Sequence, residues 1–379
     1  MSNFVNHKML HLWGGVAILV GSVIGAGILG IPYAVSKVGL GPGVVVLIAL
    51  TTATVILNLM FAEFILRTKQ DHQLPGYSRI YLGKPAAHVT LTIDLVAGYA
   101  TQLAYMIGVG EVLSAVLGGQ SFTWSIIIFL FVSVMVYKGL ETIKRFEVVV
   151  TVFIFLIVFL LAATSVPHIS MLNFTYWHIE NMHIPYGVIM FALAGYNAIP
   201  PMRRLLVRKE KYIPHVIILA YVLVFIVYLT FMYIVLGVTG TETTQIGTIG
   251  LGQKVGPFMI VMGNVLALFT ITTCYLSNGL TMRRTFQFDY NKSQLRSTVY
   301  ALIIPLVFFL LGVRNFIGIL GLAGGLILSI QSILIVITYW RAYKKGDREP
   351  EFTHGPQLLV GIVLLILFAV GALVTMLTR

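Results

Sequence analysis

The stretch GILGIP at residues 27–32 recurs in pattern as GYNAIP at residues 195–200, and both copies lie inside segments hydrophobic enough to cross a bilayer. Glycine and proline in the middle of a membrane segment predict a broken helix. The unpaired N–H and C=O groups at a break are unfavourable in hydrocarbon, so such breaks persist where they line a cavity or hold a ligand. Two breaks in corresponding places of two halves are typical of a transporter's central binding site.

The composition is that of an all-α, polytopic membrane protein. Hydrophobic residues make up 58% of the chain and charged residues 10%, with a mean hydropathy of +0.94. No polar connection is long enough for a soluble domain, so we expect a single transmembrane domain over residues 1–379. We expect eleven spans, near residues 12–36, 42–66, 88–118, 121–138, 147–167, 185–206, 214–237, 257–282, 297–313, 316–340 and 357–377.

The basic residues predict the orientation in the membrane, because cytoplasmic loops retain Lys and Arg. With the N-terminus in the cytoplasm, all 25 of them face inward except Lys37, Lys254, Arg314 and Arg379. We therefore expect a multi-pass integral protein of the plasma (inner) membrane. The net charge of +12 then reflects a basic cytoplasmic side facing anionic lipid, with no nucleic acid partner. We expect a monomer.

An internal repeat relates the two broken segments. Sliding the sequence by 168 positions, from Gly27 to Gly195, overlays spans one to five on spans six to ten. Five is an odd number, so the second copy enters from the opposite face and the repeat is inverted. We expect repeat one over about 12–167, repeat two over about 185–340, and an extra helix over 357–377. The alternative is a chance match, since glycine and proline are common in membrane helices.

The two breaks suit an α-amino acid. The half-helix that begins near Gly27 directs free N–H groups and a positive dipole end toward the gap, which suits a carboxylate. The half-helix over 191–195 ends in unpaired carbonyls, which suit an ammonium group. The alternative is that Gly25 and Gly27 only permit close packing of helices.

Three stretches resemble the amino acid/auxin permease family, within the amino acid, polyamine and organocation superfamily. GSVIGAGILGIPYAVSKVGLGPG at 21–43 resembles its opening motif, while AYMIGVGE at 104–111 and FALAGYNAIP at 191–200 are similar to its third-helix and sixth-helix patterns. The resemblance covers nearly the whole chain. It implies a LeuT-like 5+5 inverted repeat with discontinuous helices 1 and 6 and an eleventh transmembrane helix. It also implies alternating access coupled to Na+ or H+, with no other cofactor.

The resemblance also implies which residues hold the substrate. First-helix amides meet the carboxylate, carbonyls beside both breaks meet the ammonium group, and an aromatic ring, here Phe191, covers the site. The expected substrate-binding residues are Ser22, Val23, Gly25, Ala26, Gly27, Gln102, Tyr105, Phe191, Ala192, Ala194 and Tyr196. For Gln102 and Tyr105 of span three, a packed interior position is the alternative.

A sodium site is implied by the same resemblance. It combines the carbonyls of Gly21 and Ile24 with hydroxyls from span eight, which supplies Thr270, Thr272, Thr273 and Ser277. The alternative is that each threonine bonds its own preceding turn, as is usual in membrane helices. Ile28 stands where some relatives place an amide on a second sodium ion, so at most one such site is expected.

Proton coupling requires a titratable group in the membrane, where such groups are rare and functional. Glu111, in the outer half of span three, is the stronger candidate. Glu63 lies four residues before Arg67, a spacing that predicts an ion pair. Asp94 is expected to pair with a cytoplasmic basic residue. Span five contains no lysine, which argues against one proton mechanism known for the superfamily.

These patterns favour a permease, namely a secondary active symporter of amino acids. We expect neutral, apolar or aromatic substrates, because no fixed charge is expected to face the pocket. The main alternative is a receptor that senses amino acids on the same fold without transport. An enzyme is not expected, because HExxH, GxSxG and paired intramembrane aspartates are absent from the sequence, and no metal site is expected.

Overall fold

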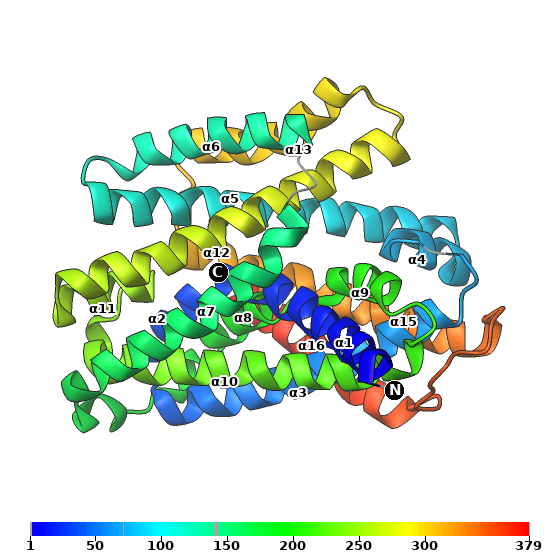
Figure 1. The fold of residues 1–379 in the computed structure, drawn as a ribbon, viewed down its shortest axis with the longest axis horizontal. Helices are drawn as coiled ribbons and strands as arrows, with labels where there is room; N and C mark the ends of the chain where they lie inside the picture. Colours follow the sequence, from blue (N-terminus) through cyan, green and yellow to red (C-terminus); the bar gives the residue numbers. More distant parts are fainter. Residues whose placement is uncertain (1, 71, 140–142, 379) are drawn as a thin grey trace.

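Apolar runs of membrane-spanning length fold into helices, because a helix satisfies its backbone hydrogen bonds within one segment. The computed structural model describes residues 2–70, 72–139 and 143–378, and this part of the chain contains helices and loops but no strand. Most of the long helices run roughly along the longest axis of the molecule (Figure 1). Both described ends of the chain are helical.

All eleven expected spans coincide with helices. They are α1 (Ser2–Val23) with α2 (Gly27–Ser36), α3 (Leu40–Leu66), α5 (Lys84–Leu117), α6 (Ser121–Lys138), α7 (Ile143–Ser165), α8 (His183–Ala192) with α9 (Ile199–Leu205), α10 (Ile213–Thr239), α12 (Pro257–Arg284), α13 (Gln294–Leu310), α14 (Phe316–Leu322) with α15 (Ser329–Lys345), and α16 (Leu358–Leu377). Within the described residues, seven helices are long and apolar enough to cross a membrane, or eight if the bent pair α1 and α2 is one span.

The predicted breaks in the first and sixth spans are confirmed. α1 and α2 meet at an angle of 55° across a gap of three residues. α8 ends at Ala192, and a single 3-10 turn over Tyr196–Ala198 precedes α9. A third irregularity was not predicted, since residues Ala323–Leu328 of the tenth span form a π-helical turn. π-bulges of this kind are often found at functional sites.

The helices that the 168-residue offset relates pack against one another. α3 contacts α10, α5 contacts α12, and α6 contacts α13. Each of these pairs joins a span of the first predicted repeat to its equivalent in the second. A pseudo-twofold axis between the halves produces this pairing. The boundaries of the two repeats stay a prediction.

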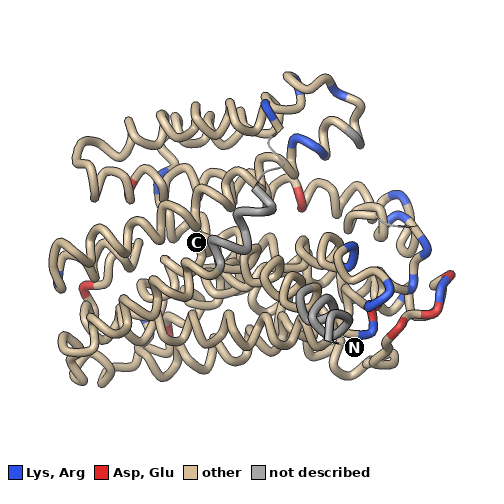
Figure 2. Tube along the Cα trace, viewed as in Figure 1, with Lys and Arg blue, Asp and Glu red and all other residues tan. Residues whose placement is uncertain are grey.

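One end of the molecule is basic. Figure 2 shows Lys and Arg gathered toward the end of the long axis where α9 and the short helix α4 (Leu74–Leu82) lie. A second short helix, α11 (Gly247–Val255), lies at the opposite end. The asymmetry expected from the sequence therefore appears as a difference between the two ends of the helix bundle. Arg379, one of the four exceptions, lies outside the described residues.

Candidate functional site

A cavity of about 250 Å³ lies where the two broken helices face each other. Its lining continues from the breaks toward the basic end of the molecule, where Gln73, Pro75 and Thr285 border it. The volume is near the lower limit of roughly 300 Å³ that is usual for small-molecule pockets. The cavity therefore suits one small molecule and opens toward the basic end.

Most of the residues expected at the site line this cavity. The lining includes Gly21, Ser22, Val23, Gly25, Gly27, Tyr105, Phe191, Ala192, Ala194, Tyr196 and Thr273. The remaining expected residues, which do not line it, are Ile24, Ala26, Gln102, Glu111, Thr270 and Thr272. The backbone positions at the breaks are thus brought together, whereas several side chains from other spans are not.

Glycine is required where the two half-helices approach each other. A Cβ atom on Gly27 would lie 2.5 Å from Ala192 Cα, so the backbones of α2 and α8 are nearly in contact. A Cβ atom on Gly25 would lie 2.9 Å from Cys274 Sγ and 3.5 Å from Tyr105 Oη. These approaches leave no room for a side chain, which explains the glycines at the first break.

Two tyrosines of α10 bind the carbonyls freed by the breaks. The hydroxyl of Tyr228 donates toward Val23 O at 3.0 Å and Ala192 O at 2.7 Å, one carbonyl from each broken helix. The hydroxyl of Tyr221 donates to Leu193 O at 2.9 Å. The tyrosines are seven residues apart, about two helical turns, so they share one face of α10.

Sequence reasoning did not identify Tyr221 and Tyr228, although a signal was present. Both are tyrosines within a strongly apolar span, and a hydroxyl buried in such a span must find a partner. Val23 O and Ala192 O are two of the carbonyls expected to meet a substrate ammonium group. In this structure they accept from Tyr228, so the hydroxyl occupies the place expected for that group.

Two of the threonines expected to bind sodium donate within their own helix, α12. Thr270 Oγ1 donates to Leu266 O at 3.0 Å, and Thr273 Oγ1 donates to Phe269 O at 2.8 Å. Thr272 Oγ1 is buried without a hydrogen-bond partner among the described residues. The side chain of α12 that lies against the break at Gly25 is the thiol of Cys274.

The two polar residues proposed for span three lie away from the cavity. Gln102 Nε2 donates to Ala301 O at 3.1 Å, which places this amide against α13. Glu111 lies a further nine residues along α5, in its half distant from the basic end. Tyr105, about one turn further along the same helix than Gln102, borders the cavity.

A carboxylate lines the cavity, and the premise that no fixed charge faces it is therefore wrong. Asp94 of α5 belongs to the lining, together with Asn197 from the break in the sixth span. Among the described residues, the hydrogen-bond partner of Asp94 is Gln331 Nε2 of α15, where a basic residue was expected. Tyr196 lies close enough to interact with both Asp94 and Gln331.

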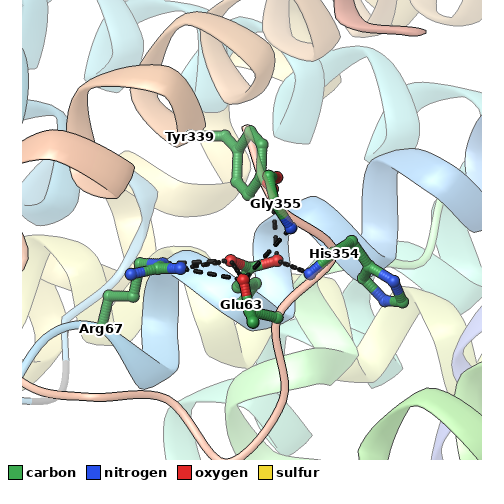
Figure 3. Close-up of polar contacts among 6 residues, drawn as sticks. Glu63, Arg67, Tyr339, His354 and Gly355 are labelled. Carbon is green, nitrogen blue, oxygen red and sulfur yellow. Dashed lines mark hydrogen bonds and ion pairs between the residues drawn. The ribbon is translucent and has the colours of Figure 1, made fainter. Parts of the chain in front are cut away.

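The second buried carboxylate, Glu63, lies in a network of an ion pair and hydrogen bonds that stabilises the structure. Its ion pair with Arg67, with Nη2 to Oε1 at 2.7 Å, confirms the prediction. Figure 3 shows Arg67 on one side of the carboxylate and the backbone of His354 on the other, whose N–H donates at 3.0 Å. Tyr339 Oη and Thr353 Oγ1 also donate to it. Glu63 thus holds the loop between α15 and α16 against the end of α3.

The sequence profile described as the tryptophan/tyrosine permease family matches residues 8–376, which is nearly the whole chain. The chain belongs to the tryptophan/tyrosine permease family. The finer assignment to the amino acid/auxin permeases stays a prediction.

Two characterised relatives are similar to this permease over almost their full length. The tyrosine-specific transport system 1 of Haemophilus influenzae is 24% identical over 386 residues, covering 96% of this chain and 95% of the relative. Glutamine transporter 2 of Aliivibrio fischeri is 23% identical over 380 residues, covering 93% and 96%.

A solved structure shows the same fold. The permease superimposes on the crystal structure of MhsT in complex with L-phenylalanine with a TM-score of 0.72, covering 96% of this chain and 97% of that one at 13% sequence identity. MhsT has the LeuT fold, so the expected all-α, LeuT-like architecture with broken first and sixth helices is confirmed.

Proposed function

We propose that this permease is a secondary active transporter of neutral amino acids that works by alternating access. The observation that carries the proposal is the cavity between the two facing breaks, bordered by the N-terminus of α2 and the C-terminus of α8. The first amides of α2 lack intrahelical partners and attract a carboxylate, while the last carbonyls of α8 attract an ammonium group. These groups together match the invariant part of an α-amino acid.

The cavity lining supports a binding mode for the amino acid. The amides near Gly25 and Gly27 bind the carboxylate, and the carbonyls of Val23 and Ala192 bind the ammonium group once the hydroxyl of Tyr228 yields them. The ring of Phe191 borders the cavity and covers the substrate. Ser22, Tyr105, Ala194 and Tyr196 complete the proposed site, and Ala26 lies in the first break outside the cavity lining.

A neutral side chain is favoured by the charges around the cavity. No Lys, Arg or His of the described residues lines it, and its carboxylate, Asp94, is eleven residues from Tyr105 along α5. That separation is about 16 Å at 1.5 Å per residue. Asp94 thus lies about three turns of α5 from Tyr105, on the side of the cavity that faces the basic end. The names of the relatives, which include tyrosine and glutamine, agree with a neutral substrate.

The orientation follows from the basic end. Positive residues usually mark the cytoplasmic side, so the basic end supports a plasma-membrane protein with a cytoplasmic N-terminus. The cavity opens toward this end, so the structure corresponds to the inward-facing state of the transport cycle.

Uptake into proteoliposomes tests the proposal. A panel of radiolabelled neutral amino acids that includes L-tyrosine, L-phenylalanine and L-glutamine is offered under an inward sodium gradient, an inward proton gradient, or neither. Saturable accumulation driven by one gradient is the expected result. Saturable binding without flux under every gradient would instead favour the receptor, and neither binding nor flux would refute both.

A further inference from the structure

Asp94 is the charged group that remains unexplained once a substrate has been placed at the breaks. Its carboxylate borders the cavity well within α5, which spans residues Lys84–Leu117, and is partly buried. An ionised carboxylate in a membrane interior is unfavourable unless it is paired, and such residues mark ion pathways. No ion pair to Asp94 is present among the described residues, and its hydrogen-bond partner there is the neutral amide of Gln331.

We infer that Asp94, held by Gln331 and next to Tyr196, is the site where the coupling proton binds during transport. The inference rests on the proposed function and assigns its driving ion. The carboxylate accepts from Gln331 Nε2 when it is ionised. Gln331 Oε1 is buried with no hydrogen-bond partner among the described residues, so this oxygen is available to accept from the acid once it is protonated. One amide is thus able to serve both protonation states.

The position of the cluster connects protonation to movement. Asp94 is on α5, Gln331 is two residues after the start of α15, and Tyr196 lies in the break of the sixth span. Gln331 also follows the π-helical turn, in which a Cβ atom on Gly324 would overlap Gly187 O of α8. The three residues therefore join a continuous helix, an irregular helix and a broken helix at the cytoplasmic half of the cavity. Neutralising the carboxylate alters the contact between all three.

The other groups around the cavity do not supply a compensating charge. Arg283 of α12 donates to Val136 O and Tyr137 O on α6, away from Asp94. Tyr81 of α4 is hydrogen-bonded to Thr68. The other titratable groups in the cavity lining are Tyr105, Tyr196 and Cys274.

The alternative driving ion, sodium, is less well served. Sodium is a hard cation and prefers oxygen ligands, as Mg²⁺ and Ca²⁺ do. At the first break the side chain of α12 nearest Gly25 is the thiol of Cys274, and two of the expected sodium ligands, Ile24 and Thr270, do not line the cavity. A proton needs no coordination shell, so Asp94 alone is sufficient to carry it.

The test compares wild type with Asp94→Asn in proteoliposomes, using radiolabelled L-tyrosine and L-glutamine as probes. With one proton per amino acid, each unit of inward pH gradient supports about tenfold accumulation by the wild type. The variant is expected to reach equal concentrations inside and outside, with no accumulation. Counterflow at equal pH on both sides needs no net proton movement, so the variant is expected to keep it within about twofold of wild type. Glu242→Gln, which removes an exposed carboxylate paired with Lys254, is the control for loss of one charge.

Several results would overturn the inference. Accumulation by Asp94→Asn under a proton gradient shows that the proton binds elsewhere, as does uncoupling by Glu111→Gln alone. Loss of counterflow together with accumulation shows a structural or substrate-binding role. If the wild type accumulates amino acid under a sodium gradient but not under a proton gradient, the proposed transport function stands and the proton is excluded as the coupling ion. Absence of wild-type counterflow for both probes and the whole panel refutes the proposed function itself.

A second variant keeps the test decisive if Asp94→Asn fails to fold. Gln331→Met removes the amide and retains the carboxylate and a similar volume. We expect it to accumulate both probes but to move the pH of half-maximal uptake, because the group that bonds the carboxylate is gone. A pH profile identical to that of the wild type would contradict the assignment.

Discussion

The substitution Tyr228→Phe removes a hydroxyl that reaches both broken helices. The ring stays, so the packing of this fully buried side chain is preserved and the change concerns hydrogen bonding alone. The hydroxyl lies 3.0 Å from Val23 O and 2.7 Å from Ala192 O, and it carries one proton. Leaving a buried carbonyl without its donor costs about 1–3 kcal/mol. We expect the free energy of unfolding of the substrate-free protein to fall by about 2 kcal/mol.

The same substitution is expected to strengthen substrate binding. In the proposed binding mode the ammonium group takes the two carbonyls that Tyr228 occupies in this structure, so the hydroxyl competes with the substrate. Removing a competitor that contributes about 2 kcal/mol lowers the Kd by up to about 30-fold. The variant should therefore be less stable without amino acid but gain more thermal stability than wild type when amino acid is added.

Thermal unfolding of the purified protein, with and without amino acid, measures the change in stability, and equilibrium binding of the amino acid measures the change in Kd. Tyr233→Phe is the matched control on the same helix. Its ring stacks on Phe174 and its hydroxyl makes no hydrogen bond to the described residues, so we expect a change within about 0.5 kcal/mol. If Tyr228→Phe unfolds like this control and binds no more tightly, the carbonyls do not depend on the hydroxyl and the reasoning is wrong.

Three further substitutions test contacts that hold the fold together, two of them beside the broken helices and one at the loop between α15 and α16. Gly27→Ala places a methyl group 2.5 Å from Ala192 Cα, so we expect lost uptake and about 1–3 kcal/mol of destabilisation, and wild-type transport would contradict the close approach. The methyl group added by Gly324→Ala would overlap Gly187 O, so this change should likewise abolish uptake. Unchanged activity would show that the π-helical turn moves freely. Glu63→Gln breaks a buried ion pair, so we expect a loss of about 3 kcal/mol by thermal unfolding and faster proteolysis between residues 346 and 356, and equal proteolysis would refute the tethering role.

The presence of each membrane-spanning segment was predictable from the sequence, because it depends on local composition. Each of the eleven expected segments coincides with helix, since a long run of apolar residues in lipid satisfies its backbone hydrogen bonds within one segment as a helix. The breaks, at residues 24–26 and between Ala192 and Ile199, were predictable for the same local reason, because glycine weakens a helix wherever it lies. The stretch 27–32 is itself helical, and Pro32 lies inside α2. The π-helical turn at Ala323–Leu328 was not predictable, because no proline marks it and its form depends on packing against α8.

The candidate site was predictable only in its backbone. Gly25, Gly27 and Phe191 lie at the breaks by sequence position, and all three border the cavity. Gln102 and Tyr105 are three residues apart on one helix, yet only Tyr105 faces the cavity. Which face of α5 turns inward is decided by the helices packed around it, and these are distant in the sequence.

The sequence by itself determined that this chain spans a membrane, where two of its helices break, and which end is basic, because length, composition and glycine content act on each segment separately. The tertiary structure decided which side chains meet at the breaks. Tyr228 reaches carbonyls from residues 205 and 36 positions away, and Asp94 meets Gln331 across 237 positions. Such contacts depend on the rotation and depth of whole helices, which are fixed when all the helices pack together.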